Sequence, residues 1–126
     1  MTSALLAIAT AAKKTGVSIA LLTGLCFTES NLVHRLNTHD GGSPSYGICQ
    51  VKLDTARMFN KNVTRSALLT NEGSAYYAAL YLSYQLDRYE GDVPKAISAF
   101  NAGRAIKSNR RYVNRVLIHA VGAQTL

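Results

Sequence analysis

The sequence predicts a mainly α-helical protein that folds as one domain. Three observations lead to this fold class: a length of 126 residues, helix-capping residues that recur ahead of apolar stretches, and one long irregular segment at about residues 34–51. A chain of this length can bury its own core without a metal or a set of disulfides to support it. We therefore expect residues 1–126 to form a single self-sufficient domain.

Two helices are expected at the N-terminal end. Thr2 or Ser3 can cap the first, which should end at Gly16, because cations in the last turn and a glycine just beyond it are typical of a helix C-terminus. Ser18 can cap the second helix, which should run to about Asn31. The second helix is almost wholly apolar before its last turn and is therefore expected to contact the core.

Turn-forming residues separate these helices from a second helical region. Asn, Asp, Gly, Ser and Pro are concentrated between residues 34 and 51, a composition typical of an irregular segment that can include short strands. Helices are then expected at about residues 54–59, 65–69 and 72–89, and Asp92 can cap the next one. A last helix should be amphipathic. Its apolar face comprises Tyr112, Val113, Val116, Leu117 and Ala120.

The net charge is strongly positive, with 14 Lys and Arg against 7 Asp and Glu. Such a balance favours polyanionic partners, namely nucleic acid, an anionic membrane or a cell-wall polymer, and does not choose among them. No apolar run approaches the length of a membrane span, and the first cations follow the apolar N-terminus, the reverse of a secretory signal. We expect no membrane insertion, and any passage across a membrane should depend on something outside this sequence.

The two cysteines, Cys26 and Cys49, stand among apolar or small neighbours. Neither has the Cys-x-x-Cys or Cys/His spacing of a metal site, and the three histidines are scattered. A disulfide between the two cysteines is one alternative. Two buried free thiols are the favoured interpretation, because free Cys packs as a small hydrophobe. No metal or other cofactor is expected.

Glu29 is the first candidate for a catalytic residue. It extends the apolar stripe of Leu25 and Cys26 at helical spacing, so it should face the core side. Burial raises the pKa of a carboxyl group, as a general acid requires, although a glutamate that simply reaches water from a helix end fits the spacing equally well. Glu29 and Asp40 are the only acids before Asp54, so a glycosidase with paired carboxylates would have to use this pair or a distant acid.

Four short elements are arranged as in a known family. They are Glu29-Ser30, Tyr46-Gly47-Ile48-Cys49-Gln50, Phe100-Asn101-Ala102-Gly103 and Tyr112-Val113. In this order and spacing they resemble the Glu-Ser, Gly-Leu-Met-Gln, Tyr-Asn-Ala-Gly and Tyr-Val elements of lytic transglycosylases of the soluble-lytic-transglycosylase (SLT) type, particularly the small ones associated with bacteriophages. The resemblance spans most of the chain and implies a lysozyme-like fold.

This resemblance implies an enzyme that cleaves the glycan strands of peptidoglycan at the bacterial cell wall. Glu29 would protonate the β-1,4 glycosidic oxygen between N-acetylmuramic acid and N-acetylglucosamine. It would then accept the proton of the muramyl 6-hydroxyl, which leaves a 1,6-anhydro end. Because the substrate's own N-acetyl group can stabilise the intermediate, no second enzymic carboxylate is required.

Five residues are expected to contact the substrate. They are Ser30, Tyr46, Gln50, Asn101 and Tyr112. Ser30 is expected to orient the Glu29 carboxyl or the acetamido group, or else only to end the helix. Gln50 and Asn101 offer amides to the substrate, Tyr46 offers a ring on which a sugar can stack, and the Tyr112 hydroxyl is expected to point at the site.

Other functions remain open from the sequence alone. The alternative nearest to a transglycosylase is a hydrolytic muramidase with the same fold. In that enzyme water attacks, and Asp40 is the second carboxylate. A non-catalytic peptidoglycan-binding module is a rival of another class, although the Glu-Ser pair is intact. Nucleic-acid binding rests only on the charge. We expect a monomer that binds peptidoglycan glycan strands and no nucleic acid, and that acts in the periplasm or as part of a virion.

Overall fold

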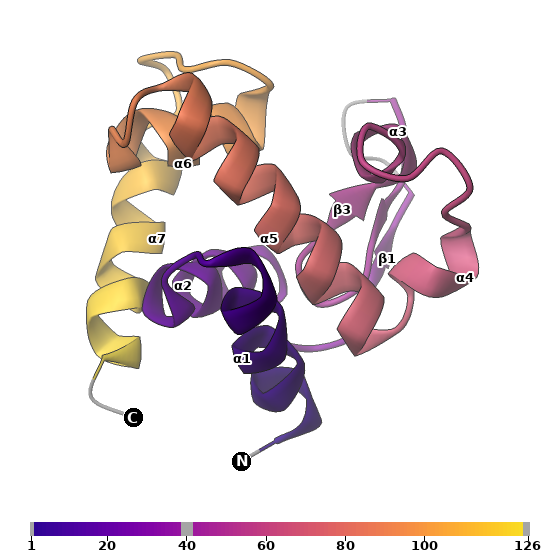
Figure 1. Cartoon of the computed structure of the whole chain (residues 1–126). Coiled ribbons are helices and arrows are strands. Elements are labelled where there is room, and N and C mark those ends of the chain that lie inside the picture. Colours follow the sequence, from indigo (N-terminus) through magenta and orange to yellow (C-terminus); the bar gives the residue numbers. More distant parts are fainter. Residues whose placement is uncertain (1, 39–41, 125–126) are drawn as a thin grey trace.

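A computed structural model of the chain describes residues 2–38 and 42–124, and its architecture confirms the mainly α prediction (Figure 1). The helices in the described part are α1 (Ser3–Thr15), α2 (Ile19–Ser30), α3 (Leu53–Arg57), α4 (Arg65–Leu68), α5 (Asn71–Arg88), α6 (Val93–Ala102) and α7 (Arg110–Ala123). None of the helices within these residues is long and apolar enough to cross a membrane.

The predicted helix caps are present. The side chains of Thr2, Ser18 and Asp92 each accept a hydrogen bond from a backbone N–H three residues later. Gly16 and Asn31 end the first two helices in the left-handed conformation, with φ of 77° and 58°. Local hydrogen bonding of the chain therefore sets these boundaries.

A small antiparallel sheet occupies the segment expected to be irregular. Its strands are β1 (Leu36–Asn37), β2 (Ser45–Tyr46) and β3 (Val51–Lys52), paired in the order β1-β2-β3. The sheet lies with α3 and α4 on one side of α5, whereas α1, α2, α6 and α7 gather on the other (Figure 1). The fold thus has a sheet lobe (β1–β3, α3 and α4) and a helical lobe, which α5 joins.

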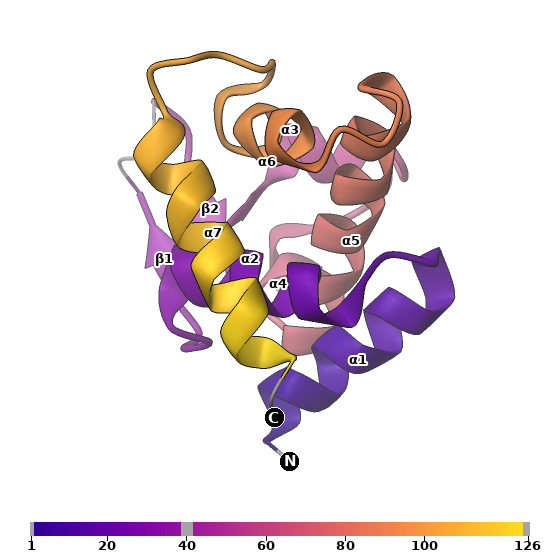
Figure 2. The same ribbon diagram turned by 90° about the vertical axis from the view of Figure 1, so that its left-hand side faces the viewer.

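Helix α2 lies inside the helical lobe. It contacts α1, α5 and α7, and Figure 2 shows α7 crossing in front of it. Leu22 and Leu25 of α2 are fully buried, as are Ile8 of α1 and Leu82 of α5. Contacts on several sides explain why the α2 sequence is apolar almost all round until its last turn.

Gly24 allows the close approach of α2 and α7. A β-carbon at Gly24 would lie 2.6 Å from the backbone nitrogen of Ala120 and 2.7 Å from the carbonyl oxygen of Val116. We expect Gly24→Ala to lower the free energy of unfolding by about 1–3 kcal/mol, because α7 must shift as a whole to admit the methyl group. Urea unfolding measures the loss. Gly122→Ala is the matched control, since a β-carbon there meets nothing within 4 Å; equal midpoints for the two variants would contradict the close approach.

Cys26 and Cys49 form a disulfide with an S–S distance of 2.01 Å, so the prediction of two free thiols is wrong. Both residues are fully buried. Apolar neighbours in the sequence suit a buried thiol and a buried disulfide equally, and only the fold brings the two α-carbons to 4.2 Å. The bond fastens the last part of α2 to the turn between β2 and β3.

Candidate active site

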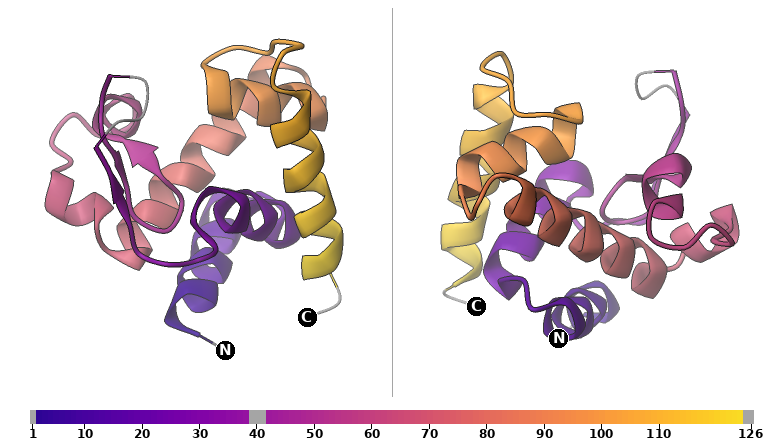
Figure 3. Two further views of the ribbon diagram at one scale, coloured as in Figure 1. Left: turned by 180° about the vertical axis from the view of Figure 1, so that it is seen from behind. Right: turned by 45° about the horizontal axis from the view of Figure 1, so that its top comes forward.

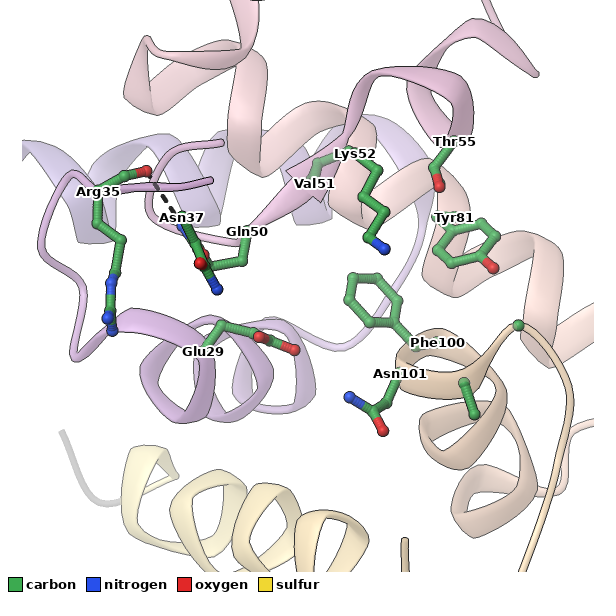
Figure 4. A pocket seen from close by; sticks show the side chains of 12 residues that line it. Glu29, Arg35, Asn37, Gln50, Val51, Lys52, Thr55, Tyr81, Phe100 and Asn101 are labelled. Carbon is green, nitrogen blue, oxygen red and sulfur yellow. Dashed lines mark hydrogen bonds between the residues drawn. The ribbon is translucent and has the colours of Figure 1, made fainter. Parts of the chain in front are cut away.

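A cavity of about 370 Å³ lies between the end of α2, the sheet and the end of α6 (Figure 4). Glu29 lines it from the last turn of α2, Gln50 lines it from the β2–β3 turn, and Asn101 lines it from the last turn of α6. From behind, the sheet lobe and the α6–α7 end of the helical lobe stand apart, with α5 running between them (Figure 3). Three of the four motif elements therefore converge on one cleft from distant parts of the chain.

The fourth element reaches the same cleft through Glu29. Tyr112, in the first turn of α7, donates a hydrogen bond of 2.6 Å from its hydroxyl to Glu29 Oε2. Both side chains are half-buried. The packing of α7 against α2 thus brings a neutral donor to a carboxyl group at the edge of the core.

The β2–β3 turn is held by several hydrogen bonds. Gln50 has φ of 53°, and its side-chain amide donates to the carbonyls of Gly47 at 2.9 Å and Arg35 at 3.1 Å. The Ser74 hydroxyl donates to the Tyr46 carbonyl and accepts from the Cys49 backbone N–H. These bonds fix the position of Gln50 on the cavity wall.

Gly47 is needed in this turn for two reasons. Its φ of 79° lies in the left-handed region, and a β-carbon would lie 2.4 Å from the Leu68 carbonyl oxygen and 2.6 Å from the Ser74 side chain. The turn therefore packs directly on α4 and α5. Ser74 belongs to none of the four motif elements.

Ser30 lies behind the cavity. It is 6% exposed, and its hydroxyl donates to the carbonyls of Cys26 and Ile48. Beside the disulfide, this contact joins the end of α2 to the β2–β3 turn. Ser30 therefore fixes the distance between the elements that carry Glu29 and Gln50.

Asn101 is exposed at the end of α6, and its Oδ1 accepts a hydrogen bond of 3.0 Å from the Asn109 amide. Asn109 also donates to the backbone carbonyl of Ser98 and accepts from the Ser98 hydroxyl. This network connects the start of α7 to α6. It orients the Asn101 amide at the cavity rim.

The aromatic rings that line the cavity do not include the tyrosine expected from the sequence. Tyr46 is 4% exposed and belongs to the core, whereas Tyr81 and Phe100 line the cavity. Their ring centroids are 5.2 Å apart, and the planes are tilted by 51°. Tyr81 was missed because one tyrosine among several on α5 carries no distinguishing pattern.

The second carboxylate considered from the sequence, Asp40, lies outside the described residues. Among residues 2–38 and 42–124, Glu29 is the one acid that lines the cavity. No group of three or more His, Cys, Asp or Glu side chains in that part of the chain is placed to hold a metal ion. The chemistry of the described site centres on a single carboxyl group and its tyrosine partner.

One solved structure to which the fold is similar is that of an inactive mutant of the lytic transglycosylase Slt from Pseudomonas aeruginosa. The match covers 95% of this chain and 24% of that one, with a TM-score of 0.83 and 18% sequence identity. It confirms the expected lysozyme-like fold.

The sequence is similar to a bacteriophage protein and to a family model. A protein of Enterobacteria phage T4, described as an uncharacterized 20.7 kDa protein in the vs-regB intergenic region, is 36% identical over 81 residues, which are 58% of this chain and 45% of that protein. The chain thus matches less than half the length of this relative. Residues 7–118 match the model of the transglycosylase SLT domain. Since that match covers most of the chain, the protein belongs to the transglycosylase SLT domain family.

Proposed function

We propose that this protein is a peptidoglycan lytic transglycosylase. It cleaves the β-1,4 bond between N-acetylmuramic acid and N-acetylglucosamine without water and leaves a 1,6-anhydro end, with Glu29 as general acid and then general base. The observation that carries the proposal is the Tyr112 hydroxyl donating to Glu29 in the cleft on which Gln50 and Asn101 also converge. Membership of the transglycosylase SLT domain family supports the same activity.

The Tyr112 hydrogen bond suits both roles of Glu29. It occupies Oε2, so we assign the proton given to the glycosidic oxygen to Oε1. When that proton leaves, Glu29 becomes a carboxylate, and a hydrogen bond to a charged acceptor is stronger than one to a neutral acceptor. The carboxylate is then oriented to take the proton of the muramyl 6-hydroxyl as its oxygen bonds to C1.

The intermediate between these steps needs stabilisation of positive charge at C1. In this mechanism the substrate's N-acetyl oxygen supplies it, as in substrate-assisted glycosidases. Gln50 and Asn101 are two of the amides that line the cavity, and hydrogen bonds hold both side chains in fixed orientations. We assign them to contacts with sugar hydroxyl or acetamido groups.

The products of purified peptidoglycan distinguish the proposal from its rivals. Mass spectrometry is expected to find soluble fragments whose muramyl ends are lighter by one water than ordinary reducing ends. Ordinary reducing ends, together with loss of activity in Asp40→Asn, would identify a hydrolytic muramidase instead. Binding to the wall without any soluble fragment would identify a non-catalytic module.

Tyr112→Phe is expected to lower kcat by about 10–100-fold with little change in KM. The variant keeps the ring and loses one hydrogen bond to a group that becomes charged in the reaction, an interaction of roughly 1.5–3 kcal/mol. The rate of release of anhydro fragments measures it. Tyr76→Phe is the control, because Tyr76 is exposed on α5 and does not line the cavity. A wild-type kcat for Tyr112→Phe would remove the role assigned to the hydroxyl.

A further inference from the structure

The charged side chains that line the described part of the cavity are one acid and two bases. Glu29 is the acid, and Arg35 and Lys52 are the bases. Figure 4 shows Arg35 and Lys52 on opposite sides of Glu29, with Gln50 between them. Among the described residues that line the cavity, the charge balance is therefore positive where the glycan strand would bind.

The strand geometry places the Lys52 side chain at the cavity. In β3, Val51 is 3% exposed and packs into the core, and adjacent residues of a strand point to opposite faces. Lys52 therefore turns outward, and its ammonium group points towards Phe100 and Asn101 across the cavity (Figure 4). The backbone of Lys52 is paired with Ser45 of β2 and leads directly into α3.

Arg35 is held at the other side of the cleft. Its carbonyl accepts hydrogen bonds from the Gln50 side chain and the Gly47 backbone N–H, just before β1 begins. Its exposed side chain extends along the cleft. The two cations thus project from opposite edges of one small sheet, on fixed backbone.

We propose that Lys52, assisted by Arg35, binds a carboxylate on the muramyl substituent of the glycan strand. This inference rests on the proposed function. The N-acetylated sugar rings of such a strand are uncharged, and its carboxylates lie on the lactyl group or on the attached peptide. Lys and Arg recognise carboxylates through charge-assisted hydrogen bonds, and a cleft with excess positive charge favours an anionic ligand. Lys52 and Arg35 are therefore specificity-determining residues for strands that carry carboxylates.

Binding to Glu29→Gln protein tests this assignment without turnover. Isothermal titration calorimetry would compare three tetrasaccharides of the glycan strand: one with stem peptides, one without peptides and with free lactyl carboxylates, and one with its carboxyl groups methyl-esterified. Lys52→Met is expected to weaken binding of a carboxylate-bearing ligand about tenfold and to leave the esterified ligand unchanged. Loss with the second ligand assigns the lactyl carboxylate, and loss with the first alone assigns the peptide.

Two further variants separate local recognition from net charge. Lys52→Arg is expected to retain the binding that Lys52→Met loses. Lys61→Met removes the same charge from an exposed position after α3 that does not line the cavity, and it is expected to bind like the parent protein. Equal losses for Lys52→Met with charged and esterified ligands, or no loss with either, would overturn the inference. Failure of the proposed function is seen separately, as an absence of anhydro products from the wild-type protein.

Discussion

Glu29→Gln is expected to abolish peptidoglycan cleavage while leaving the fold and glycan binding intact. The amide is nearly isosteric with the carboxyl group, and its oxygen can still accept the hydrogen bond that Tyr112 donates. It cannot deliver a proton to the glycosidic oxygen or remove one from the 6-hydroxyl. Because a positioned acid or base contributes roughly 10²–10⁴-fold to the rate and Glu29 is assigned both roles, we expect a loss of at least about 10³-fold.

The rate at which a suspension of purified cell walls clears measures this loss, and circular dichroism with urea unfolding checks the fold. Glu72→Gln is the matched control, because Glu72 lies in the first turn of α5 and does not line the cavity. That variant should lose only the small stabilisation of an acid near a helix N-terminus and keep its activity. Clearance by Glu29→Gln at the wild-type rate would contradict the central assignment.

The helices were predictable because their boundaries depend on local chemistry. Ser18 and Asp92 cap helices through atoms three residues away, and Gly16 ends α1 with a conformation that glycine adopts easily. The sheet was not predictable in detail. Each of its strands has only two residues, which is too short to show the alternation by which strands are recognised.

The site residues likewise divide into those that the sequence indicated and those that it did not. Glu29, Gln50, Asn101 and Tyr112 belong to motifs whose order indicated a family, and the fold brings them together. Lys52, like Arg35 and Tyr81, belongs to none of those motifs. A single cation or aromatic ring outside a motif has the same appearance in the sequence wherever it lies in the fold, and only the tertiary fold shows which cavity it lines.

Removal of the Cys26–Cys49 disulfide is expected to lower the free energy of unfolding by about 3 kcal/mol. The two residues are 23 apart in the sequence, and a link across a loop of that length restricts the unfolded chain by roughly this amount in the chain-entropy model. Urea unfolding of Cys26→Ala/Cys49→Ala measures the loss. Reductant should also lower the free energy of unfolding of the wild type. It should not change that of the double variant, which therefore serves as the control for effects of reductant that do not involve the disulfide.

The disulfide should also affect activity, because it positions elements of the site and not because its sulfur atoms take part in the reaction. It joins α2, which carries Glu29, to the turn that carries Gln50, and the Ser30 hydroxyl spans the same junction. At temperatures well below its unfolding midpoint, the double variant is therefore expected to keep cleaving peptidoglycan at a reduced rate, whereas Glu29→Gln does not cleave at any temperature. Disulfides persist in oxidising compartments such as the periplasm, where the proposed substrate lies. A wild-type midpoint that reductant leaves unchanged would show that the bond does not support the fold in solution, and the junction would then depend on Ser30 and Ser74 alone.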